Sequence, residues 1–190
     1  MKMLKEFIKI WLVGLVVLIF GFGLVLASNA YAKTDKEINK EVSVALKQFS
    51  EQVKGGKELL KRAKGVLVIP KLGKVGVGAI GGEYGAGALR IKGKTVGYYD
   101  LMGGSFGFEI GGERVNLILL FMEDKALKHF EESSDWQAGA DANVTFLKTA
   151  VAREASTDTI NKPVIGVIYG EKGLMANASI EGAKFTKRKK

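Results

Sequence analysis

The chain has 190 residues, of which 47% are hydrophobic and 26% are charged, and its net charge is +9. This length allows one domain with a substantial core, and the composition excludes a disordered or collagen-like chain. The excess of positive charge favours an anionic partner, such as nucleic acid, an anionic membrane or an acidic polymer.

The first 32 residues have the pattern of an export signal. Three lysines within the first nine residues precede an apolar run over residues 10–27, and Ala-Tyr-Ala at 30–32 provides a signal-peptidase site. We therefore predict a signal peptide over residues 1–32, or an uncleaved inner-membrane anchor through residues 10–27, since this run just suffices to span a bilayer. In both cases the rest of the chain is expected in the periplasm or cell envelope. Nucleic acid is then excluded as a partner.

Residues 34–63 are predicted to be helical. Thr34 and Glu37 have the spacing of a capping box, in which hydroxyl and carboxylate satisfy free backbone amides. One apolar stripe follows at intervals of three and four: Ile38, Val42, Ala45, Phe49 and Val53. Gly55-Gly56 interrupts it, and a shorter second helix is predicted over 57–64. The pattern predicts an amphipathic helix packed on a core, or alternatively one lying on a membrane, because lysines crowd its second half.

From Gly65 onward the pattern is typical of strands. We predict strands over these ranges: 66–69 (ended by Pro70), 83–91, 95–101, 105–110, 114–122, 140–147, 164–169 and 174–180. Lys92-Gly93-Lys94 predicts a tight hairpin, and Gly111-Gly112 a further turn. The strand RVNLILLFM is apolar on both faces in its middle, which favours a central position.

One further helix is predicted over Glu123–Ser133, and the closing KFTKRKK is interpreted as a solvated basic terminus. Strands and helices do not alternate strictly, so a doubly wound parallel sheet is not expected. The predicted fold is a single α+β domain. Its sheet is mainly antiparallel and strongly curved or barrel-like, with N-terminal amphipathic helices and one further helix.

Glycines at 76, 78 and 81 satisfy the spacing G-x-G-x-x-G of a dinucleotide-binding loop. Such a loop must open a helix, but the next residues contain Gly82, Gly85 and Gly87, and each glycine disfavours a helix by about 1 kcal/mol. Gly76 and Gly78, and separately Gly85 and Gly87, are two apart, so each pair shares one face of a strand. Missing side chains there allow a sharp bend or a close approach of another element. We therefore predict that the glycines curve the sheet.

Two further patterns could indicate enzymatic chemistry. The sequence GGSFG matches G-x-S-x-G around Ser105, but an alternating strand pattern follows it instead of a helix. His129 is the only histidine, and there is no cysteine and no calcium-loop motif. We predict no catalytic, cofactor-binding or metal site, and therefore a protein that is not an enzyme.

The order of several motifs resembles the SYLF-domain family over about residues 50–185. The motifs are AKGVLVIPKLGKVGVGAIGGEYGAG, GGSFGFEIGGERVNLILLFMEDKAL, GADANV and YGEKGLMANASIEGAKF. The resemblance implies a lipid-binding domain without enzymatic activity. Eukaryotic members are associated with phosphoinositide membranes and some with actin filaments, whereas bacterial members commonly carry a signal sequence. After GADA many relatives are glycine-rich, but this chain reads NVTFLKTAVARE.

In some eukaryotic relatives the helical part before the glycine-rich segment is linked to membrane contact, which points to residues 49–64. Because an exported protein meets neither phosphoinositides nor actin, we carry over only the binding of anionic phospholipid. The predicted domain spans residues 33–186, followed by a basic tail at 187–190. Phe49 and Val53 are predicted to insert into the lipid if their helix releases from the core. The predicted headgroup contacts are Lys54, Lys57, Lys61, Arg62 and Lys64.

Two alternatives use the same features differently. The domain could bind another anionic envelope polymer such as lipopolysaccharide, which requires charge but no apolar insertion. It could instead be a structural or protein-interaction domain that uses a sheet face or edge. A ligand pocket inside the curved sheet is neither required nor excluded by glycine-rich walls.

Overall fold

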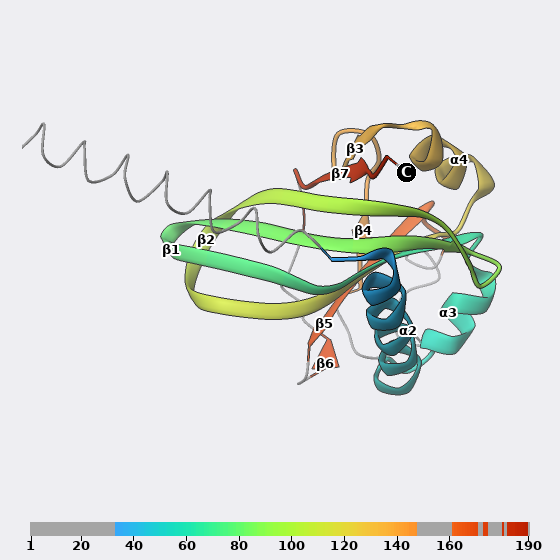
Figure 1. The fold of residues 1–190 in the computed structure, drawn as a ribbon, viewed down its shortest axis with the longest axis horizontal. Coiled ribbons are helices and arrows are strands. Elements are labelled where there is room, and N and C mark those ends of the chain that lie inside the picture. The colour runs from blue at the N-terminus through green and yellow to red at the C-terminus, as the bar shows by residue number, and fades with distance from the viewer. Residues whose placement is uncertain (1–32, 148–160, 171–172, 175–179, 181, 190) are drawn as a thin grey trace, which may run out of the picture. The chain divides into compact units, whose positions relative to one another are not determined.

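The structure is a computed structural model that describes residues 33–147, 161–170, 173–174, 180 and 182–189 (Figure 1). Side chains are not described for residues 74–80, 105–113 and 173–174. The predicted signal peptide or anchor at 1–32 and most of the predicted strand 174–180 lie outside the described residues. Residues 34–190 form one compact unit, and the core clusters draw only on residues of this unit. We therefore expect residues 33–190 to fold without the preceding segment.

Helices α2 (Asp35–Gln52) and α3 (Gly56–Arg62) confirm the predicted N-terminal helices. The Thr34 hydroxyl accepts a hydrogen bond from the Glu37 amide at 3.3 Å, and the Glu37 carboxylate accepts one from the Thr34 amide at 2.9 Å. All five residues of the predicted apolar stripe are buried. Gly55 separates the helices with a left-handed φ of 88°, which glycine adopts without steric cost.

A long antiparallel hairpin follows, made of β1 (Gly65–Ile91) and β2 (Lys94–Phe121). Its two-residue turn has φ values of 50° at Lys92 and 79° at Gly93, as a tight hairpin requires. The predicted end of the strand at Pro70 is wrong. A bulge between Ile69 and Leu72 accommodates the proline, and the strand continues beyond it. The predicted turn at 111–112 is also wrong, because both glycines pair with β1 within the ladder.

The hairpin curls until the second half of β1 lies against its first half. A Cβ atom at Gly87 would stand 1.8 Å from the Val68 carbonyl oxygen, and one at Gly85 would stand 2.5 Å from a methyl group of Ile69. Only glycine permits this approach of backbone to backbone. The predicted role of the glycines in sheet curvature is thus confirmed for this pair.

Five short strands complete the sheet: β3 (Asp135–Gln137), β4 (Thr145–Phe146), β5 (Val164–Gly170), β6 (Gly173–Leu174) and β7 (Lys184–Lys187). Within the described residues the sheet has seven strands in the order β3-β7-β2-β5-β4, with β1 on β2 and β6 on β5. All pairs are antiparallel except β4 with β5. The predicted α+β fold with a strongly curved, barrel-like sheet is confirmed. The strand predicted over 140–147 is shorter than expected, and β3 was not predicted.

The end of β2 is buried on both sides, as its sequence predicted. Leu117, Leu119 and Phe121 belong to one core cluster together with helix α4 (Asp124–Glu132), whose Leu127 and Phe130 are buried. The intervening Ile118 and Leu120 belong to a second cluster with α2. This alternation follows from the two-residue period of a strand. It places helices on opposite faces of the same sheet (Figure 1).

The C-terminal sequence KFTKRKK is not a solvated tail in its described part. Strand β7 pairs with β2 and β3, and the Phe185 side chain is fully buried. Arg188 forms a two-pronged ion pair with Asp100, with a shortest distance of 2.6 Å between Nη2 and Oδ1. The expectation of a solvated terminus was wrong. Most residues of this segment are charged, and the burial of the single Phe185 is not evident from such a pattern.

Candidate functional site

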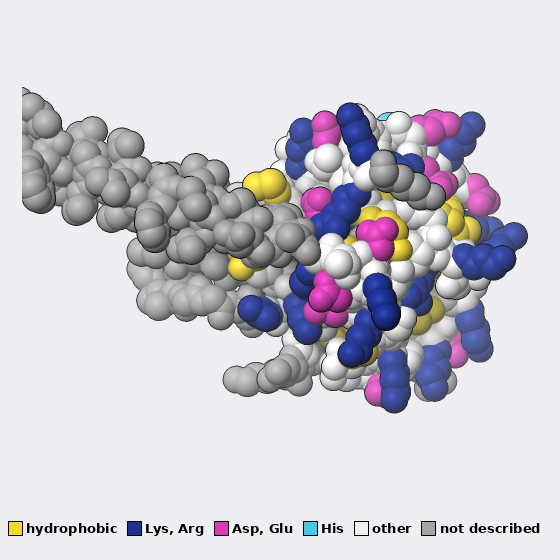
Figure 2. Space-filling view, in the orientation of Figure 1, with side chains coloured by type: hydrophobic (Ala, Val, Ile, Leu, Met, Phe, Trp, Pro, Cys, Tyr) yellow, Lys and Arg dark blue, Asp and Glu magenta, His cyan; other side chains and the backbone are white. Residues whose placement is uncertain are grey.

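Helix α3 and its flanks present the cations that the sequence predicted as headgroup contacts. We call Lys54, Lys57, Lys61, Arg62 and Lys64 the α3 basic surface, and all five side chains are exposed. Lys57 and Lys61 are four residues apart and share one face of α3, whereas Leu59 on the other side is buried. In the space-filling view, lysine and arginine side chains gather at the end of the domain where α3 lies (Figure 2).

Most of this surface is not neutralised by neighbouring carboxylates. Lys64 lies 3.7 Å from Asp124, and both side chains are well exposed, so the pair contributes little to stability. Within the described part of the chain, Lys54, Lys57, Lys61 and Arg62 have no carboxylate within the 4.0 Å of an ion pair. The surface therefore carries a net positive charge available to an anionic partner.

Phe49 and Val53 do not lie with these cations on the surface. Phe49 is fully buried and Val53 is 2% exposed, and the Phe49 ring packs against Tyr169 at a centroid distance of 5.9 Å. The Tyr169 hydroxyl also donates a buried hydrogen bond of 2.6 Å to the Ala45 carbonyl of α2. Lipid insertion of these two residues would require α2 to leave the core. That insertion stays a prediction, and the structure supplies no surface position for it.

A second feature of interest is the tip of the β1–β2 hairpin, for which the sequence predicted only a turn. Lys92, Gly93 and Lys94 are exposed, and the nearby Val96 is 44% exposed. The Lys-Gly-Lys sequence was the available signal, because it places two cations at the most protruding part of a hairpin.

A groove of about 580 Å³ lies between α2, the Pro70 bulge and the ends of β2 and β5. Lys71 at the bulge pairs with Glu41 at 2.9 Å, and its amide donates to the Asn116 side chain at 3.1 Å. Arg114 and Lys40 are further cations along the groove. These contacts tie α2 to the sheet, and no sequence pattern had indicated them.

The residues that could have indicated an enzyme, Ser105 and His129, lie in a regular strand and a surface helix. Ser105 pairs with Gly81 inside the hairpin ladder and does not stand on a strand-to-helix turn. His129 is exposed in the last turn of α4. In the described ranges, no three His, Cys, Asp or Glu side chains are grouped as a metal site would need. No described helix is long and apolar enough to cross a membrane.

The structure is thus a small α+β domain with a group of exposed cations on α3 and its flanks. Residues 102–190 match a family model described as "Ysc84: Las17-binding protein actin regulator". This match confirms the SYLF-domain assignment that the motif order predicted, and that family is one of binding domains. No curated protein matches the chain. The α3 basic surface precedes the matched residues, so the match does not itself assign a role to it.

Proposed function

We propose that residues 33–190 form an exported, non-enzymatic domain that binds anionic phospholipid membranes through the α3 basic surface. The observation that carries this proposal is the set of exposed cations on α3 and its flanks, four of which have no carboxylate partner within the described residues. The family supports a binding role, and its description names an actin regulator that binds Las17. We favour lipid for this chain because export would separate it from actin.

The expected strength follows from the number of cations. Each lysine or arginine near an anionic bilayer contributes roughly 1 kcal/mol at low salt, so four contribute on the order of 4 kcal/mol. This contribution decays within a Debye length of about 10 Å at 0.1 M salt. Because Phe49 and Val53 lie in the core, binding by the α3 basic surface alone should be largely electrostatic.

The test is co-sedimentation of residues 33–190 with anionic and zwitterionic phospholipid vesicles at about 50 mM salt, where screening is weak. In one variant, Lys54, Lys57, Lys61 and Arg62 are changed to Gln. A control variant has the same change in net charge at exposed positions elsewhere: Lys47, Lys128, Lys162 and Lys189. We expect anionic vesicles to bind the control nearly as well as the wild type, and the α3 variant at least about 100-fold more weakly.

Equal weakening of both variants would mean that net charge, and not the α3 basic surface, controls binding. No binding of the wild type to anionic vesicles would refute the lipid proposal. If lipopolysaccharide without a bilayer then binds the wild type but not the α3 variant, the domain binds an envelope polymer instead.

Export is a separate part of the proposal and has its own test. The full chain is expressed in a Gram-negative host, and the N-terminus of the accumulated protein is sequenced. A first residue of Lys33 in the periplasmic fraction would support a cleaved signal peptide. An intact N-terminus in the membrane fraction would support the anchor, and an intact protein in the cytoplasm would refute export.

A further inference from the structure

The tip of the β1–β2 hairpin combines charge with exposed apolar surface. We define the hairpin tip as Lys92, Gly93, Lys94 and Val96. Val96 is 44% exposed, and among the described residues only Val44 and Met102 are other large hydrophobic side chains of comparable exposure. Two lysines beside an exposed valine are the arrangement expected of a segment that enters a lipid headgroup region.

The backbone at the tip holds a lysine where other residues are better suited. Lys92 has a φ of 50°, a left-handed conformation that glycine and asparagine adopt more readily in such turns. Its side chain is exposed and makes no described ion pair. A residue kept in an unfavourable backbone conformation without a structural contact suggests a use for its side chain outside the domain.

Hydrogen bonds just behind the tip join the hairpin to α2. The Asn39 amide donates to the Tyr98 hydroxyl at 2.6 Å, and the Thr95 hydroxyl donates to the Asn39 side-chain oxygen at 2.7 Å. Arg90 donates to the Ser43 hydroxyl at 2.8 Å. The tip is therefore ordered before any partner arrives, which lowers the entropic cost of binding.

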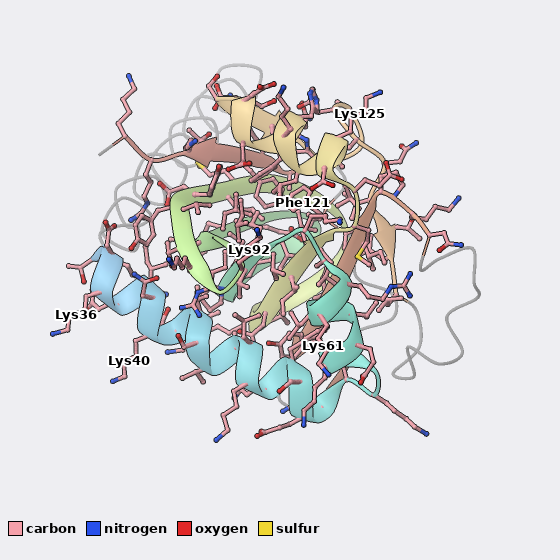
Figure 3. The ribbon with its side chains drawn as sticks, turned by 90° about the vertical axis from the view of Figure 1, so that its right-hand side faces the viewer. Lys36, Lys40, Lys61, Lys92, Phe121 and Lys125 are labelled. Carbon is pink, nitrogen blue, oxygen red and sulfur yellow. The ribbon has the colours of Figure 1, made fainter. Side chains whose placement is uncertain are left out.

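The hairpin tip and α3 lie at the same end of the domain. In Figure 1 the turn between β1 and β2 reaches the side on which α3 lies. Figure 3 views the domain from that side, and Lys92 at the tip and Lys61 of α3 are both seen there. One flat anionic surface can thus contact both elements.

We propose that the hairpin tip is a second contact for the anionic phospholipid bilayer, with Val96 as the apolar group that enters it. This inference rests on the proposed function and supplies what that function lacks, because the apolar residues first predicted to insert are buried in the core. The α3 basic surface attracts the bilayer, and the tip anchors the domain. Some binding should then persist at high salt, where purely electrostatic attachment is lost.

Insertion is measured directly by placing a tryptophan at position 96. The Val96→Trp variant of residues 33–190 is mixed with anionic vesicles that contain brominated acyl chains, which quench nearby indoles. Met102→Trp is the matched control, because Met102 is 60% exposed on the same strand but six residues, roughly 20 Å, further along. The native Trp136 is 1% exposed and provides a constant background.

We expect a blue-shifted and quenched indole in the Val96→Trp variant and neither change in the Met102→Trp variant. Binding of the wild type without quenching at position 96 would overturn the tip inference while leaving the proposed function intact. If both variants were quenched equally, the contact would not be specific to the tip. Absence of wild-type binding would remove the proposed function and the inference together.

A second measurement addresses the lysines. Changing Lys92 to Asn and Lys94 to Gln should weaken binding to anionic vesicles by about 30-fold at about 50 mM salt. The control change of Lys128 and Lys162 to Gln should weaken it by less than about threefold. The asparagine suits the left-handed position, so the melting temperature should not fall. Equal effects of the two double variants would overturn the role of the tip lysines.

Discussion

The closure of the curled hairpin at Gly87 can be tested with a single methyl group. In Gly87→Ala the new Cβ would stand 1.8 Å from the Val68 carbonyl oxygen and 2.7 Å from a methyl group of Ile69. An ordinary contact between carbon and oxygen is above 3 Å, so the two halves of β1 must separate by more than 1 Å. Backbone cannot rotate aside as a side chain can. Overpacking in a core costs typically 1–3 kcal/mol, and we expect about 3 kcal/mol or more here.

For a domain of this size, about 3 kcal/mol corresponds to a fall in melting temperature of roughly 6–12 °C. The assay is thermal unfolding of residues 33–190 followed by circular dichroism. Gly104→Ala is the control, because Gly104 lies in the same hairpin and a Cβ there meets no atom within 4 Å. We expect this control to melt within about 2 °C of the wild type. If Gly87→Ala also melted within about 2 °C of the wild type, the two halves of β1 would not be in contact, and the described curl would be wrong.

Two further predictions concern pH and the C-terminus. Burial, followed by the nearby negative charge of Glu131, raises the pKa of Tyr99 from 10.0 to about 12, and burial also raises the pKa of Tyr169. Because the fold favours the neutral phenols, their stabilisation is complete below pH 10 and declines as the pH rises from 10 towards 12. The measurement uses a variant of residues 33–190 with Tyr84 and Tyr98 changed to Phe, in which only Tyr99 and Tyr169 can absorb as tyrosinate. Their absorbance should appear together with unfolding, and ionisation in this variant while it remains folded at pH 10.5 would contradict the prediction. Deleting residues 184–190 should destabilise the domain by more than about 3 kcal/mol, since it removes buried Phe185 and the Arg188 ion pair. An unchanged melting temperature would show that the segment is a solvated tail after all.

Local sequence patterns predicted the elements whose contacts lie close in the chain. The capping box at Thr34, the interruption at Gly55 and the hairpin turn at Lys92-Gly93 each depend on a few neighbouring residues, and all three are confirmed. The central position of the end of β2 was also predictable, because only a strand covered on both faces is apolar in consecutive positions.

The errors occurred where distant contacts override local preferences. Pro70 usually ends a strand, but the pairing of β1 with β2 on both sides of it makes a bulge preferable to a break. Strand β7 was missed because its pattern is dominated by lysines, and only the packing of Phe185 among aromatic rings reveals it. The same distinction holds for the candidate site. The exposure of the cations was predictable from local sequence, whereas the burial of Phe49 depends on its contact with Tyr169, which is distant in the chain.

The sequence by itself determined the class of this protein: a basic α+β domain that resembles the SYLF family, with an amphipathic helix, a glycine-rich hairpin and a basic segment beside it. Composition, periodicity and motif order are enough for this, because they depend on each residue and its near neighbours. Only the tertiary structure decided which apolar residues face the solvent. Phe49 and Val53 are buried between α2 and the sheet, whereas Val96 beside the hairpin turn is 44% exposed. Burial depends on which distant segment lies opposite a side chain, and no local pattern specifies that.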